Sequence, residues 1–168
     1  MQTLGLAWEE TPSAAFHEIH IERDKPVHHG ARQLLDIWTA REAEGRFTVG
    51  RDVPSRGLAR LLSGLALFQP ILHGDFRVRL AGLAMRRRFG RDVTGEKLSE
   101  LLTDEQFADH SERLQALLEG GRPLLLETRL NEGGRLRLCY EMLVLRVFAP
   151  DGVTPWAMSG IFFHDWRL

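Results

Sequence analysis

A long strand-like segment near the C-terminus, Arg135–Phe148, fits only a few kinds of architecture. Its first half, RLRLCYE, alternates apolar and more polar residues, as in a strand that has one face in water. Its second half, MLVLRVF, is apolar on both faces. Because an antiparallel strand normally keeps one face solvated, this half predicts a sheet that is covered on both sides.

The segments around it have the patterns of further strands. Residues 124–130 alternate before the turn Glu132-Gly133-Gly134, and WAMSGIFFHDW follows the turn APDGVTP. Upstream, LALFQPIL and DFRVRLA are two more strand-like segments. Tight turns join most of these five strands, and helical patterns separate the second strand from the third. The sequence therefore predicts an α+β fold, with helices packed on an antiparallel sheet.

A helix is predicted over residues 27–45, ahead of the first strand. An apolar stripe at i, i+3, i+4 and i+7 marks its buried side, and a glycine at 45 ends it; the stripe is Ala31, Leu34, Leu35 and Trp38. The first 25 residues have little periodicity, although the isoleucines at 19 and 21 would suit a short edge strand or an extended arm. We expect an N-terminal arm at 1–25 and a single domain at 26–168.

Two similar stretches, GRDVPSRGLARLL (50–62) and GRDVTGEKLSELL (90–102), raise the question of an internal repeat. Strands follow the first stretch and a helix follows the second, so we interpret both as starts of short helices. The second stretch lacks the Lys-Ser/Thr pair of a phosphate-binding loop. Gly90 is expected to end the preceding helix, and Thr103 with Gln106 fits a capping box.

Composition restricts the class of protein. The chain has 168 residues, 43% of them apolar, and a net charge of −1, which suits one packed domain and argues against an overall basic nucleic-acid binder. No apolar run is long enough to span a bilayer, the N-terminus lacks a secretory pattern, and Cys139 is alone. We therefore expect a cytoplasmic protein with no membrane or nucleic-acid partner. Three successive arginines, 86–88, point about 100° apart on a helix and are interpreted as a solvated face.

No catalytic or metal-binding pattern stands out. His28 and His29 are adjacent and would diverge, and Ser159 lacks a surrounding G-x-S-x-G elbow. The alternative of a small enzyme, such as an isomerase or cyclase with an apolar pocket, would need an acid or base in that pocket. His164 and Asp165 are the late-strand candidates. We predict no catalytic residues and no metal ligands.

Seven residues are candidates for the interior between the sheet and the helices. They would either pack against one another or line a small cavity for an apolar or aromatic ligand, with the tyrosine as a polar handle. The seven are Phe89, Leu101, Phe107, Leu114, Tyr140, Met142 and Phe162.

The stretch DFRVRLAGLAMRRRFGRDVTGEKLSELL resembles a bacterial family of PAS domains. Members of that family carry a strand of the form D-F-R-Y-R-L-x-G, then F-G-R-D-L-T-G and a leucine-bearing helix. The match runs over Asp75–Gly82, Phe89–Gly95 and Leu98–Leu102, and GGRLRLCYEMLVLRVF is similar to a later strand of the family. The resemblance covers roughly Pro26 to the C-terminus, and the tyrosine of the first motif is Val78 here.

The resemblance implies a PAS fold, with a five-stranded antiparallel sheet of order 2-1-5-4-3, helices on one face and a leading helix that often dimerises. It implies a role in signal transduction, by sensing or by protein interaction, and not the catalytic turnover of a substrate. We expect a homodimer through the N-terminal helix and an unknown regulatory partner. Leu34, Leu35 and Trp38 would carry the contact of this helix, either within the chain or across the dimer. Because no output segment follows, we expect a stand-alone module. Besides a sensory module and a small enzyme, a third possible class of protein is a haem or flavin photosensor. We predict no cofactor, because the inserted helices lack an obvious Cys or His to attach one.

Overall fold

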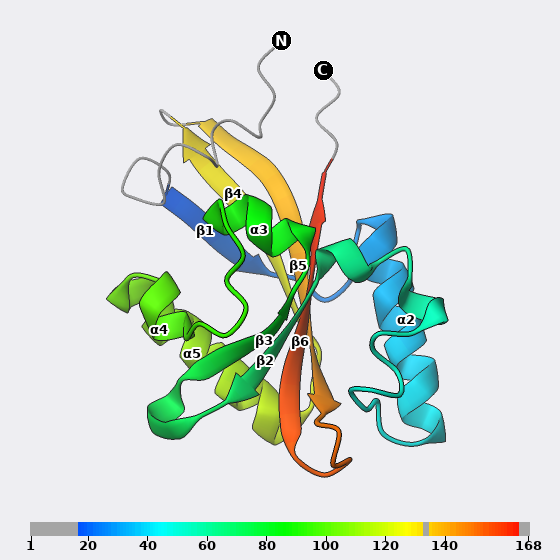
Figure 1. The fold of residues 1–168 in the computed structure, drawn as a ribbon. Helices are drawn as coiled ribbons and strands as arrows, with labels where there is room; N and C mark the ends of the chain where they lie inside the picture. The colour runs from blue at the N-terminus through cyan, green and yellow to red at the C-terminus, as the bar shows by residue number, and fades with distance from the viewer. Residues whose placement is uncertain (1–16, 133–134, 165–168) are drawn as a thin grey trace.

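The two-faced segment forms an inner strand of a six-stranded antiparallel sheet, in a computed structural model that describes residues 17–132 and 135–164 (Figure 1). The order across the sheet is β1-β4-β5-β6-β2-β3. In chain order the strands are β1 (His17–Glu22), β2 (Leu65–Pro70), β3 (Phe76–Ala81), β4 (Leu124–Glu132), β5 (Arg135–Phe148) and β6 (Pro155–Phe163). The predicted α+β class and antiparallel sheet are confirmed.

The predicted strand count of five is wrong, because β1 adds an edge strand. β1 pairs antiparallel with β4, with His20 opposite Thr128. The alternation at 19 and 21 therefore marks an edge strand, and residues 1–16 of the expected arm lie outside the described residues. The other five strands keep the order implied by the resemblance, so the observed sheet differs from it by β1 alone.

Helices cover both faces of this sheet, as the pattern of β5 predicts (Figure 1). One face carries α2 (His29–Glu44) with two 3-10 turns, η1 (Arg56–Leu58) and η2 (Leu62–Gly64). The opposite face carries α3 (Leu83–Phe89), α4 (Leu98–Leu101) and α5 (Asp104–Gly120). A third 3-10 turn, η3 (Leu72–Gly74), joins β2 to β3. Each face therefore has its own apolar core.

α2 lies inside the range expected from its apolar stripe. Leu34 is fully buried, and Leu35 packs at the border of the same core. Trp38 donates its indole N–H to the backbone oxygen of Arg146 in β5 at 2.9 Å. Of the two alternatives for these three residues, a contact within the chain or one across a dimer, the structure shows the contact within the chain.

Local signals in the sequence place several helix ends correctly. Gly90 ends α3 in the left-handed conformation, at φ 71°, which a glycine adopts without the steric penalty of a Cβ. Thr103 and Gln106 form the expected capping box at the start of α5. Within residues 17–132 and 135–164, no helix is both long and apolar enough to cross a bilayer.

The two similar stretches both begin with G-R-D-V, but they form different secondary structure on opposite faces of the sheet. Val53 and Val93 are both fully buried, but they belong to the cores on opposite faces of the sheet. The second stretch forms the single turn of α4, as expected, whereas the first forms only the 3-10 turns η1 and η2. The α-helix predicted from the leucine spacing of the first stretch is therefore wrong, because its chain turns directly into β2.

Candidate functional site

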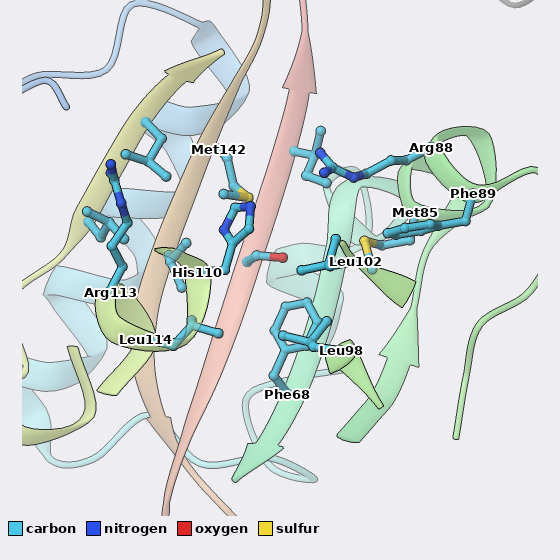
Figure 2. A pocket seen from close by; sticks show the side chains of 15 residues that line it. Phe68, Met85, Arg88, Phe89, Leu98, Leu102, His110, Arg113, Leu114 and Met142 are labelled. Atoms are coloured by element: carbon cyan, nitrogen blue, oxygen red, sulfur yellow. The ribbon is translucent and has the colours of Figure 1, made fainter. Parts of the chain in front are cut away.

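A cavity of about 60 Å³ lies between the sheet and helices α3 to α5 (Figure 2). Its wall on the sheet side comes from β2, β4, β5 and β6, and most lining side chains are apolar. The lining residues are Phe68, Met85, Arg88, Phe89, Leu98, Leu102, His110, Arg113, Leu114, Leu124, Leu126, Met142, Val144, Ser159 and Ile161.

The structure brings together three of the seven predicted interior residues at this cavity. Phe89, Leu114 and Met142 line it. Leu101 and Phe107 pack against the same core, although they do not line the cavity. Both of these side chains are half-buried.

The two remaining predicted residues lie elsewhere. Phe162 belongs to the core on the opposite face, where its ring stacks with that of His28 at 5.4 Å between centroids. Its position follows from the register, since Phe162 pairs with Glu141 while Ile161 pairs with the lining residue Met142. Tyr140 is fully buried in the core on the cavity side, although it does not line the cavity.

Tyr140 nevertheless contacts the wall of the cavity. The Arg88 side chain donates from Nη1 to the tyrosine hydroxyl, and Arg88 itself lines the cavity. The Arg88 side chain is half-buried as well as hydrogen-bonded. The prediction that 86–88 form a solvated face is wrong for Arg88, whereas Arg86 and Arg87 are exposed.

Four polar residues share the lining with the apolar side chains. Ser159 lies on β6, Arg88 on α3, and His110 and Arg113 one turn apart on α5. Figure 2 shows Arg88 and Arg113 on opposite sides of the cavity, with His110 between them. No Asp or Glu side chain is part of this lining, although Asp109, outside it, pairs with Arg113.

Two of these polar residues have buried atoms without a partner. Ser159 is 2% exposed, and its hydroxyl has no hydrogen-bond partner among the residues that the structure describes. The same holds for Nη1 of Arg113, although Nε of this arginine lies 3.3 Å from Oδ1 of Asp109. Buried polar atoms are nearly always hydrogen-bonded, so Ser159 and Arg113 depart from this rule within the described residues.

His110 corrects the reasoning about cofactors. The prediction of no haem or flavin rested on inserted helices without a histidine, but His110 lies in α5 and lines the cavity. Its ring packs edge-on against that of His20 in β1, with 5.2 Å between the centroids.

The histidine considered for catalysis lies away from the cavity. His164 Nε2 is 3.8 Å from Oε1 of Glu141, and its ring meets that of His28 at 5.4 Å between centroids. Burial lowers the pKa of His164, Glu141 opposes this effect, and His28 adds to it. Its proposed companion, Asp165, lies outside the described residues. No group of three or more potential metal ligands occurs in the described part of the chain.

Comparison with known proteins gives the family. A family model of the PAS domain matches residues 27–162, which is most of the chain. The chain belongs to the PAS-domain family. PAS domains are generally sensory or signalling modules without enzymatic activity. No curated protein matches the chain.

The signature residues of this PAS domain have structural roles. The Asp75 carboxylate accepts hydrogen bonds from its neighbour Phe76 and from the backbone N–H of Ser99 in α4 at 3.2 Å. Val78 is fully buried, and its backbone N–H donates to the oxygen of Glu96. The motif therefore fixes α4 against β3, which builds one wall of the PAS cavity.

The polar lining of the cavity could not be found from the motif. Ser159 is the single hydroxyl residue in the apolar run WAMSGIFF, and that isolation was the available signal. Arg113 and His110 fall three residues apart on the side of α5 that also carries Leu114 and Leu117. A helical projection of α5 would have placed them at the edge of its buried side.

Proposed function

We propose that this PAS domain is a sensory module that binds a small, mostly apolar organic molecule in the cavity between α3, α4, α5 and the sheet. The observation that carries the proposal is the buried hydroxyl of Ser159, which has no partner in the described chain and belongs to the lining of a mostly apolar cavity. A wall built only for packing would gain stability from an alanine at this position. We infer that the hydroxyl is there for a ligand.

The volume of the cavity limits the ligand. A water molecule needs about 10–15 Å³ of such space and occupies about 30 Å³ in the liquid, so the cavity corresponds to about four to six waters. That is roughly the volume of one aromatic ring. A porphyrin or flavin is much larger, so we propose that the module works without either cofactor.

Ligand binding would be transmitted through α5 and β1. His110 of α5 contacts the ring of His20, whose Nδ1 lies 3.0 Å from the hydroxyl of Thr128. β1 leads directly into α2, whose start is held by Glu141 of β5 through the backbone N–H groups of Val27 and His28. A shift of α5 would therefore change the position of the start of α2, on the opposite face of the sheet.

PAS domains often mediate protein interaction. We propose that a regulatory partner or a second copy of the chain binds at α2 and that the position of this helix controls the binding. Leu34 is fully buried, so a second copy would contact the outer side of this helix instead. Light scattering at rising protein concentration, with and without ligand, tests self-association directly. An unchanged monomer mass under all conditions would contradict the dimer.

A binding experiment with small aromatic probes tests the sensory function. We expect toluene, benzyl alcohol or benzoate to bind saturably in ligand-observed NMR. The variant Leu102→Trp should abolish this binding, because the new ring would fill the cavity that Leu102 lines. The matched control is Leu72→Trp, since Leu72 is 81% exposed and does not line the cavity. Equal binding by both variants, or no binding by wild type, would contradict the proposal.

A further inference from the structure

We propose that residues 1–16 bind to a basic groove on the same chain, with Trp8 against its apolar floor and Glu9 and Glu10 close to its arginines. The groove lies beside the start of α2, so the bound segment would restrict the access of any partner to this end of the helix. The contact does not depend on a ligand in the cavity, and its failure would leave the proposed function standing.

The groove has a volume of about 440 Å³ and lies between the start of α2, η2 and α3, with the end of β6 as its floor (Figure 1). Its apolar lining includes Leu61 and Phe162, which are each 7% exposed, and Leu83, which is 49% exposed. Pockets of about 300–1,000 Å³ are the usual size for bound organic groups. The groove can therefore take an aromatic side chain, which would also cover Leu83.

The charged part of the groove is basic. Arg60 and Arg87 both line it, and both side chains are exposed. Neither forms an ion pair or a side-chain hydrogen bond within residues 17–132 and 135–164. No Asp or Glu of the described chain lines this groove. An occupant with carboxylates next to an apolar side chain would therefore match both its charge and its floor.

The run of three arginines separates into three different environments. Arg86 lies 3.2 Å from Oδ2 of Asp92, and Arg88 donates to Tyr140 on the cavity side. Arg87 is the one of the three that lines the groove. It follows Leu83 by one turn of α3, so these two residues lie on the same side of the helix. α3 thus presents an apolar and a basic side chain together to an occupant.

Residues 1–16 have the composition that this groove requires. They read MQTLGLAWEETPSAAF, with Glu9 and Glu10 directly after Trp8 and no Lys or Arg. The segment therefore combines an aromatic side chain with two adjacent negative charges. Residues 165–168, DWRL, are the other terminal segment outside the described residues, and there Arg167 offsets Asp165. Charge complementarity favours residues 1–16.

The start of β1 is close enough to the groove for this contact. One row of paired residues crosses the sheet from β1 to β6, namely His20, Thr128, Tyr140 and Phe163. Three strand spacings put His20 about 14 Å from Phe163, which lines the groove, and His17 lies about 10 Å further along β1. The chain from Trp8 to His17 can span up to about 30 Å. Trp8 can therefore reach the groove of its own chain.

Paramagnetic relaxation in the full chain tests the contact. A nitroxide on the variant Gly5→Cys should broaden the amide signals of residues 60–64 and 83–87. It should leave unchanged those of residues 151–154, which precede β6 at the end far from Phe163. Cys139 is 1% exposed and so stays unlabelled.

Variants of both partners test the chemistry of the contact. Glu9→Gln combined with Glu10→Gln should lower the ratio of bound to free segment about fivefold, because two exposed ion pairs are lost. Arg60→Gln should lower it by a smaller factor. The control Arg122→Gln, at an exposed position outside the groove, should leave it unchanged.

Three outcomes would overturn the proposal. The first is that the groove signals are not broadened, or that their broadening is unchanged in the Glu9→Gln/Glu10→Gln protein. The second is broadening in a mixture of 15N-labelled chain without nitroxide and unlabelled chain with it, which would assign the contact to a second copy. The third is broadening of the groove signals by a nitroxide on Leu168→Cys but not on Gly5→Cys, which would assign the groove to the C-terminal segment.

Discussion

Thr128 and Ser159 are two buried hydroxyl residues on the same face of the sheet, and they differ in one respect. The hydroxyl of Thr128 lies 3.0 Å from Nδ1 of His20, whereas that of Ser159 has no partner in the described part of the chain. Both side chains are almost completely inaccessible, at 0% and 2% exposed. The first contact stabilises the fold, whereas we propose that the second hydroxyl bonds to a ligand.

Removing each hydroxyl should therefore change stability in opposite directions. Ser159→Ala should raise the free energy of unfolding of the ligand-free protein by about 1 kcal/mol, because an unbonded buried hydroxyl is costly. Thr128→Val should lower it by about 1 kcal/mol through the loss of a hydrogen bond. Urea denaturation measures both values. A clear loss of stability in Ser159→Ala would show that its hydroxyl is already bonded within the protein.

Tyr140→Phe should loosen α3. The tyrosine hydroxyl accepts from the guanidinium of Arg88, and bonds to charged groups contribute about 1.5–3 kcal/mol. Chemical denaturation should show a loss in this range, and hydrogen exchange should show faster opening of residues 83–89. Arg87→Gln is a matched control, because it changes an exposed position of α3 without touching this bond. Unchanged exchange of α3 in Tyr140→Phe would contradict the anchoring role.

Glu141→Gln should release the start of α2. The buried carboxylate accepts from the backbone N–H of Val27 at 2.8 Å and from that of His28 at 2.9 Å. An amide offers one acceptor in place of two charged oxygens, so we expect a loss of roughly 2 kcal/mol. Hydrogen exchange should increase first in α2. Glu119→Gln, at an exposed position of α5, should change neither quantity.

The pH dependence of stability should carry a contribution from His164. Because burial lowers its pKa in the folded state below the ordinary value of about 6.5, the unfolded chain binds the proton more readily. Stability is therefore complete above about pH 6.5 and declines as the pH falls toward the lower folded-state pKa. His164→Gln should reduce this decline between pH 7 and pH 5.5, as measured by denaturation midpoints.

The control for this titration is His29→Gln, at an exposed position in the first turn of α2. It should leave the decline of stability unchanged. A decline that is the same in wild type and in His164→Gln would show that other groups dominate in this range. Asp52 contributes only at more acidic pH, because hydrogen bonds from Arg51 and Thr48 outweigh its burial and hold its pKa below the ordinary value of a carboxyl group.

Local features of the fold could be predicted from the sequence. The left-handed Gly90, the capping box at Thr103 and the stripe of α2 depend on residues within one or two turns of each other. The resemblance added the sheet order, which no periodicity in this chain could supply. The sequence offered the sixth strand only as one of two alternatives, an edge strand or an extended arm, because β1 is defined by its pairing with β4.

The side of the sheet on which a residue lies was harder to predict. β6 is apolar on both faces, so alternation carries no information about which residues face α2 and which face the cavity. Phe162 was therefore placed with the wrong neighbours, and Ser159 was considered only as a nucleophile. Both positions follow from the register between β5 and β6, which involves contacts far apart in the sequence.

The most direct test of the cavity is a crystal structure of the protein grown with saturating benzoate. We predict density for one aromatic ring between Phe68, Leu114 and Met142, with a carboxylate oxygen within hydrogen-bonding distance of the Ser159 hydroxyl. A cavity closed by its own side chains, with benzoate absent or bound only at the surface, would contradict the account.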